Sequence, residues 1–148
     1  MSQRTERVDN LSSLYTALVD SRTGYQEALI DAEGRGMTPL FREMTSLRDQ
    51  NTAELKRHLT ALGAVADDDG SFMSTVHKTI MDVRSLFGGL DKSILPGLVD
   101  GEQRILSYYD EALKRSPLDT PEYSALMAQS QVLRAKVADW KRNIEQAA

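Results

Sequence analysis

The sequence contains no cysteine and only two histidines, and these shortages exclude several kinds of site. Without cysteine there is no disulfide framework, no thiolate metal site and no cysteine nucleophile. Aromatic residues make up only 6% of the chain and β-branched aliphatic residues are few, which disfavours strands. Methionine and alanine are plentiful instead, so the composition favours helices.

The chain also lacks an excess of positive charge and any long apolar run. Its formal net charge is −4 over 148 residues, whereas a general nucleic-acid-binding protein presents a basic face. No apolar run approaches the roughly 20 residues of a membrane-spanning helix, and the polar start of the chain is unlike a secretory signal. We therefore expect a cytoplasmic protein of one domain, residues 1–148, with residues 1–7 disordered, that binds neither nucleic acid nor membrane.

Apolar residues recur every three or four positions in four long segments, which is the spacing of an amphipathic helix. The segments cover residues 8–32, 40–62, 95–113 and 123–144. Thr-Pro precedes the second and fourth segments, as a capping residue followed by proline at the first helical position. Gly63 follows the second segment and predicts the end of its helix, because glycine tolerates the left-handed conformation that ends many helices. A shorter apolar pattern, from Phe72 to Phe87, predicts one more helix.

Two short phrases occur twice, about eighty residues apart. They are Thr38-Pro39-Leu40-Phe41 with Thr120-Pro121-Glu122-Tyr123, and Tyr25-Gln26-Glu27-Ala28-Leu29 with Tyr109-Asp110-Glu111-Ala112-Leu113. The repeat indicates two related helical hairpins. The helix between them could span roughly 24 Å and return the chain along the bundle, which is the connection of ferritin-like folds. The predicted fold is therefore all-α: a ferritin-like four-helix bundle of two antiparallel hairpins with a short helix in the crossover.

The sequence lacks the residue pattern of a ferritin-like di-iron centre. Such a centre takes a glutamate from each of two helices and a Glu-x-x-His pair from each of the other two. Neither His58 nor His77 has a glutamate three residues before it. We therefore expect no cofactor and no metal. If a non-standard metal site exists, its ligands would be Glu27, Glu54, His58 and Glu102.

A polar residue interrupts each apolar stripe near the estimated middle of its segment. The four residues are Arg22, Asn51, Glu102 and Ser130. Because a buried glutamate is costly unless it is paired, one interpretation is a central polar layer with an Arg22–Glu102 ion pair, to which Asn51 adds a hydrogen bond. The alternative is that Arg22 lays its stem on the core and extends its charged group into solvent. The sequence gives these two interpretations about equal weight.

The repeat, the Asp-x-x-x-Gly-Tyr segment at Asp20–Tyr25 and the pair Gly101-Glu102 give the chain a family resemblance. It resembles a ferritin-like four-helix-bundle family of bacterial proteins of unknown function, over about residues 11–143. The resemblance implies a bundle fold, a bacterial source and often a stress-associated setting, but no reaction. In that family an acidic residue is common at the position of Arg22 and a histidine near Val137, so both departures weigh against metal binding here.

No catalytic set can be assembled from the sequence, which has neither a Ser-His-Asp arrangement nor a glycine-rich phosphate loop. The first hypothesis is a non-enzymatic bundle without catalytic residues that acts by self-association, as a homo-oligomer, or by binding a protein partner. The second is a degenerate ferritin-like metal-binding protein or oxidoreductase that uses the four possible ligands named above. The third and weakest is a protein that binds a small ligand between its helices.

Overall fold

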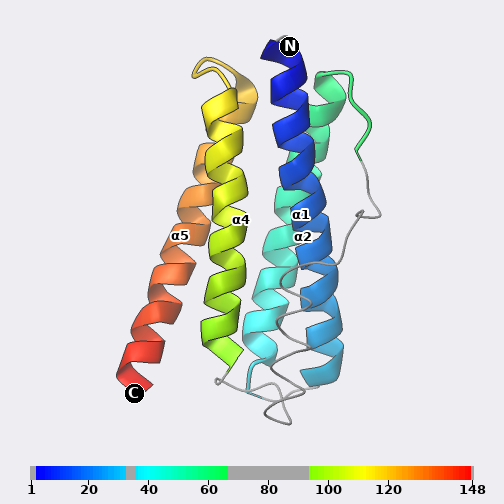
Figure 1. The fold of residues 1–148 in the computed structure, drawn as a ribbon. Helices are drawn as coiled ribbons and strands as arrows, with labels where there is room; N and C mark the ends of the chain where they lie inside the picture. Colours follow the sequence, from blue (N-terminus) through cyan, green and yellow to red (C-terminus); the bar gives the residue numbers. More distant parts are fainter. Residues whose placement is uncertain (1–2, 33–35, 67–93, 148) are drawn as a thin grey trace.

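The computed structural model describes residues 3–32, 36–66 and 94–147, and four long helices account for most of them (Figure 1). They are α1 (Gln3–Ala32), α2 (Thr38–Ala61), α4 (Leu95–Arg115) and α5 (Pro121–Ala147). These described residues contain no strand, so the prediction of an all-α protein is confirmed for them. The shorter helix predicted for residues 72–87 lies outside the described residues.

The four helices lie side by side, and each is antiparallel to its neighbours (Figure 1). Contacts join α1 to α2, α4 to α5, α1 to α4 and, least extensively, α2 to α5. Helices α2 and α4 run in the same direction and have no direct backbone contact, so they lie diagonally across the group. A side chain that joins α2 to α4 must therefore cross the middle of the four helices.

The ends of α2 agree only partly with the sequence signals. Gly63 has a φ of +80°, and the amide of Ala64 donates to the Leu59 carbonyl at 2.9 Å, so glycine ends this helix as predicted. At the start, however, Met37 is the N-cap residue and no side chain caps the helix. Thr38 is already helical, and its buried hydroxyl has no hydrogen-bond partner in the described part of the chain. The expected capping role of Thr38 is therefore wrong.

The first residues of the chain are more ordered than the sequence suggested. Residues 3–7, which we expected to be disordered, form the beginning of α1. The guanidinium of Arg4 donates to the carbonyl of Leu62, next to the end of α2. Arg7 forms an ion pair with Glu122 at 2.6 Å, and the Glu122 side chain is almost fully buried. These two arginines connect the start of α1 to the end of α2 and the start of α5.

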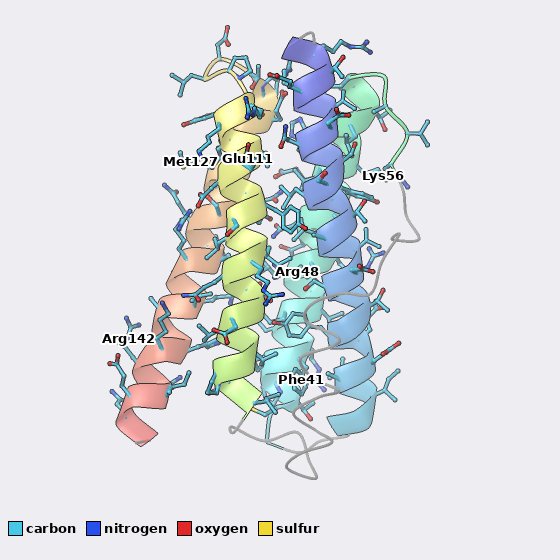
Figure 2. All side chains as sticks on the ribbon, viewed as in Figure 1. Phe41, Arg48, Lys56, Glu111, Met127 and Arg142 are labelled. Atoms are coloured by element: carbon cyan, nitrogen blue, oxygen red, sulfur yellow. The ribbon has the colours of Figure 1, made fainter. Side chains whose placement is uncertain are left out.

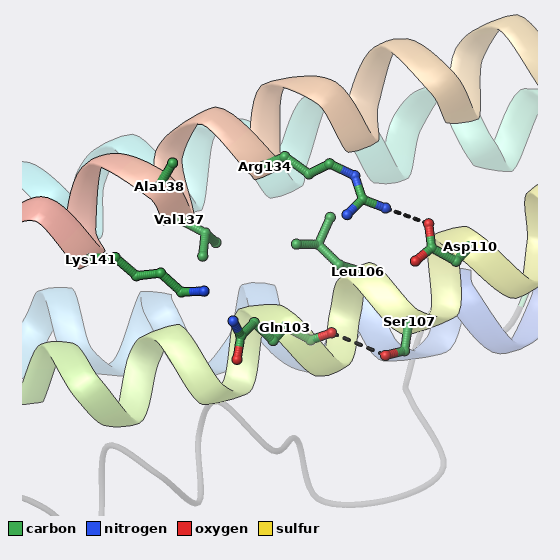
Figure 3. A pocket seen from close by; sticks show the side chains of 8 residues that line it. All are labelled: Gln103, Leu106, Ser107, Asp110, Arg134, Val137, Ala138 and Lys141. Atoms are coloured by element: carbon green, nitrogen blue, oxygen red, sulfur yellow. Dashed lines mark hydrogen bonds and ion pairs between the residues drawn. The ribbon is translucent and has the colours of Figure 1, made fainter.

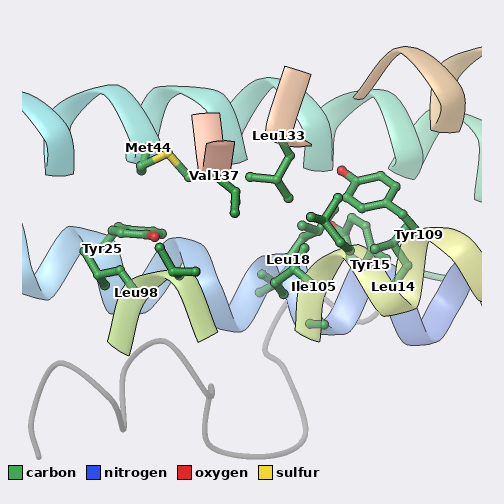
Figure 4. Close-up of a cluster of buried hydrophobic side chains, with 14 of the residues drawn as sticks. Leu14, Tyr15, Leu18, Tyr25, Met44, Leu98, Ile105, Tyr109, Leu133 and Val137 are labelled. Carbon is green, nitrogen blue, oxygen red and sulfur yellow. The ribbon is translucent and has the colours of Figure 1, made fainter. Parts of the chain in front are cut away.

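Apolar side chains from all four helices meet in one core (Figure 4). Leu18, Met44, Leu98 and Leu133 represent the four helices in it, and none is more than 1% exposed. Near its middle α1 is buried on all sides, because every residue from Leu14 to Val19 is buried. None of the described helices is long and apolar enough to cross a membrane.

Candidate functional site

The centre of the molecule holds an ion pair between Arg48 of α2 and Glu102 of α4. Neither side chain has any exposed surface. Arg48 lies near the middle of α2 and points inward, between the helices (Figure 2). Because α2 and α4 are diagonal to each other, the pair crosses the middle of the four helices. A buried ion pair of this kind needs further hydrogen bonds to offset the loss of hydration.

Two residues of α1 supply these hydrogen bonds. The hydroxyl of Tyr25 donates to Oε2 of Glu102 at 2.6 Å, and Nε of Arg48 donates to the hydroxyl oxygen of Ser21 at 3.1 Å. Hydrogen bonds to a charged group are shorter and stronger than those between neutral groups. Together, these four side chains, the charged cluster, join α1, α2 and α4 around one buried charge pair. The terminal nitrogen Nη1 of Arg48 makes no hydrogen bond to any described residue.

Burial and the charges of the ion pair together set the protonation states of Arg48 and Tyr25. Burial lowers the pKa of the Arg48 guanidinium, but the negative charge of Glu102 raises it, and the net pKa lies above its ordinary value. Burial, followed by the charge of Glu102, raises the pKa of the Tyr25 hydroxyl well above its ordinary value. Arg48 is therefore positively charged and Tyr25 is a neutral hydrogen-bond donor at physiological pH.

A second set of polar side chains joins α2, α4 and α5. We call it the neutral cluster because its buried members, Asn51, Tyr109 and Gln129, are amides and a hydroxyl. The hydroxyl of Tyr109 donates to Oε1 of Gln129 at 2.8 Å and accepts a longer bond, 3.4 Å, from the amide of Asn51. The Gln129 amide in turn donates to Glu54 at 2.8 Å. Burial raises the pKa of Tyr109 above its ordinary value, against an opposing effect of the Arg48 charge. Glu54, the only charged member, is partly exposed at the edge of the cluster.

The four residues of the predicted polar layer are not joined to one another by hydrogen bonds or ion pairs. Glu102 and Asn51 are buried, but they belong to the two different clusters. Ser130 is also buried, yet its hydroxyl donates to the carbonyl of Met127 in its own helix. Arg22 is part of neither cluster: it lies 3.6 Å from Asp49 and donates to the Thr52 hydroxyl at 3.2 Å.

The predicted Arg22–Glu102 ion pair is therefore wrong, and Arg48 takes the place expected for Arg22. The reason lies in helix geometry, because consecutive residues of a helix point about 100° apart. Ser21 faces the core and is fully buried, so its neighbour Arg22 is turned away and keeps 28% of its side chain exposed. Its partner Asp49 is 54% exposed, which places this pair at the surface.

Sequence reasoning missed Arg48, and a usable signal was present. The buried positions of α2 step through Phe41, Met44, Arg48, Asn51 and Leu55, each three or four residues after the last. Leu47 satisfies the same spacing and is apolar, so the three-to-four pattern of the segment 40–62 favours it over Arg48. The structure turns Leu47 partly toward solvent and Arg48 fully inward. The signal was a charged residue at stripe spacing, since Arg48 follows Met44 by four residues and precedes Asn51 by three.

The four possible metal ligands do not come together in the structure. Glu27 is exposed, Glu54 and His58 are partly exposed, and Glu102 is fully buried against Arg48. Across the part of the chain that the structure describes, no three carboxylate or histidine side chains are placed to hold a metal ion. His77 lies outside that part.

Comparison with known proteins gives one family. No curated protein and no solved structure matches the chain. The family described as a domain of unknown function, DUF2383, matches residues 6–115. These residues include all four members of the charged cluster and end with the last residue of α4, so the match does not extend to α5. Because the match covers well over half of the chain, the protein belongs to the DUF2383 family.

Proposed function

We propose that the protein is a non-catalytic, ferritin-like four-helix bundle that acts through its outer surface, by binding a protein partner or further copies of itself. The contacts between neighbouring antiparallel helices and the parallel, diagonal placement of α2 and α4 support the ferritin-like arrangement. The family resemblance supports a bacterial source and a stress-associated setting, and the proposed cytoplasmic location follows from the sequence.

The buried Arg48–Glu102 pair is the observation that carries this proposal. Active ferritin-like proteins direct carboxylates and histidines from all four helices toward metal ions in the middle of the bundle. Here the positive charge in the middle comes from Arg48, which neutralises Glu102 directly. A cation bound beside Glu102 would be repelled by the guanidinium and would compete with it for the same carboxylate. The interior is thereby committed to holding the helices together, which leaves the surface for recognition.

The alternative, a degenerate metal-binding protein or oxidoreductase, has less support. It would require Glu27 to leave the surface and Glu102 to leave Arg48. Removing one partner of a buried ion pair costs about 3–5 kcal/mol, which the metal would have to supply in addition to binding.

Two measurements on the full chain test the proposal. Elemental analysis after incubation with Fe²⁺ or Mn²⁺ and desalting should find no stoichiometric metal. Sedimentation velocity over a wide concentration range, with affinity capture from the cells that naturally produce the protein, should find either self-association or a reproducible partner. Stoichiometric metal would overturn the proposal, and so would a monomer that captures nothing.

A further inference from the structure

Helix α5 stands apart from the other helices in two respects. It lies beyond the residues that match the family, and it is bordered by an open groove on each side. The groove between α4 and α5 has a volume of about 370 Å³, and the groove between α2 and α5 about 500 Å³. These grooves are the surfaces at which a partner could contact α5 together with a neighbouring helix.

The α4–α5 groove combines an apolar floor with a positive end (Figure 3). Leu106 and Val137 form the floor, and both belong to the core beneath it. At one end Arg134 pairs with Asp110. At the other end the ammonium group of Lys141 lies on the side of Gln103 (Figure 3) and has no ion pair within the described residues.

The charges of the groove indicate which partner fits it. Asp110 neutralises Arg134, so Lys141 leaves a net charge of about +1 above an apolar floor, on a protein whose overall charge is negative. The groove follows eight residues of each helix, 103–110 and 134–141, which corresponds to roughly 10 Å or two helical turns. An aliphatic side chain on the floor and a carboxylate one turn away would satisfy both features.

We propose that the α4–α5 groove binds an acidic amphipathic helix of a protein partner, with an aliphatic side chain on Leu106 and Val137 and a carboxylate against Lys141. This inference rests on the proposed function and names the surface and the chemistry of the partner. A nucleic acid fits less well, because the apolar floor offers nothing to a phosphate backbone and only one cation is unpaired.

The α2–α5 groove provides a matched control for this proposal. It also contains one ion pair, between Lys136 and Glu43, and one cation without an ion pair in the described residues, Arg42. Its apolar lining differs, since Val132 is 47% exposed whereas Leu106 and Val137 of the α4–α5 groove are 7% and 4% exposed. Arg42→Glu therefore changes the net charge of the protein as much as Lys141→Glu does, but in the wrong groove.

The test uses a fluorescently labelled synthetic helix with leucines four residues apart and glutamates beside them, and a second peptide in which lysines replace the glutamates. Fluorescence anisotropy should show that the full chain binds the acidic peptide at least about tenfold more tightly than the basic one. Lys141→Glu should weaken binding about tenfold and Arg42→Glu less than twofold. Ala138→Gln, which narrows the groove without changing charge, should weaken binding about fivefold.

Several outcomes would overturn the proposal. Equal losses from Arg42→Glu and Lys141→Glu would show general electrostatic attraction, and no binding at about 1 mM peptide would show that the groove is not a docking site. Self-association that disappears in Lys141→Glu would show that a second copy occupies the groove. Circular dichroism of each variant confirms that it is folded. Because metal analysis and sedimentation of the parent protein are independent of these peptides, failure here leaves the proposed function intact.

Discussion

The two polar clusters lie in neighbouring parts of the same interior, but they are held in different ways. The charged cluster places a full positive and a full negative charge where neither has any exposed surface. The neutral cluster passes hydrogen bonds from Asn51 through Tyr109 and Gln129 to Glu54, which is partly exposed. The loss of a partner should therefore destabilise the two clusters by different amounts, because an unpaired buried charge costs far more free energy than an unpaired buried amide.

The clusters also differ in the helices that they join. The charged cluster connects α1, α2 and α4, which all lie within the residues that match the family. The neutral cluster is the one that reaches α5, beyond the match. We interpret the charged cluster as the feature that sets the position of α1, α2 and α4, and the neutral cluster as a weaker attachment of α5.

The largest expected effect comes from separating the charges. Arg48→Leu leaves the Glu102 carboxylate buried without its cation and should lower the free energy of unfolding by about 3–5 kcal/mol, measured by urea denaturation. A variant that also carries Glu102→Leu and Tyr25→Phe removes the carboxylate and its hydroxyl donor and leaves only the Ser21 hydroxyl of the cluster, so it should recover most of that loss. If this triple variant is as unstable as Arg48→Leu alone, the cost does not arise from an unpaired charge.

A smaller effect is expected in the neutral cluster. Gln129→Leu removes the acceptor of the Tyr109 hydroxyl and should lower the free energy of unfolding by about 1–3 kcal/mol in the same experiment. Adding Tyr109→Phe removes the unsatisfied hydroxyl and should restore part of the stability. A loss as large as that of Arg48→Leu would remove the distinction between the two clusters.

The smallest effect concerns alkaline pH. Well below pH 10, Tyr25 and Tyr109 are protonated in both the folded and the unfolded chain. Near and above pH 10 they ionise in the unfolded chain while their raised pKa keeps them protonated in the fold, so each of these tyrosines should lower the free energy of unfolding by about 1.4 kcal/mol in total between pH 9 and pH 11. Tyr25→Phe and Tyr109→Phe should each reduce the loss of stability by about 1.4 kcal/mol, measured by denaturation between pH 9 and pH 11. An unchanged loss in both variants would contradict the burial of these hydroxyls.

Much of the fold could be predicted from the sequence, because local signals decide where helices form. Three-to-four spacing of apolar residues located all four long helices, and the glycine after α2 marked its end. The start of α2 was less predictable. Threonine before proline is a common cap signal, but Met37 occupies that position because the helix begins one residue earlier.

The candidate site could be predicted only in part. Glu102 and Asn51 were recognised as polar residues on apolar stripes, and both are buried. Their partners were not recognised, because a step of three and a step of four are both compatible with a helix. Leu47 and Arg48 compete for one position in α2, and on α1 the buried residue is Ser21 rather than Arg22. Leu47 still packs against the core from its edge, but Arg48 and Ser21 are the residues that point fully inward.

By itself, the sequence determined the helical composition and the approximate position of each described helix, since periodicity and glycine act within a few residues. Only the tertiary structure decided that Glu102 pairs with Arg48 and receives the Tyr25 hydroxyl. The physical reason is that this choice depends on how far each helix is rotated about its axis and on which helices lie diagonally. Those properties arise from the packing of the whole core and are not encoded in any one helix.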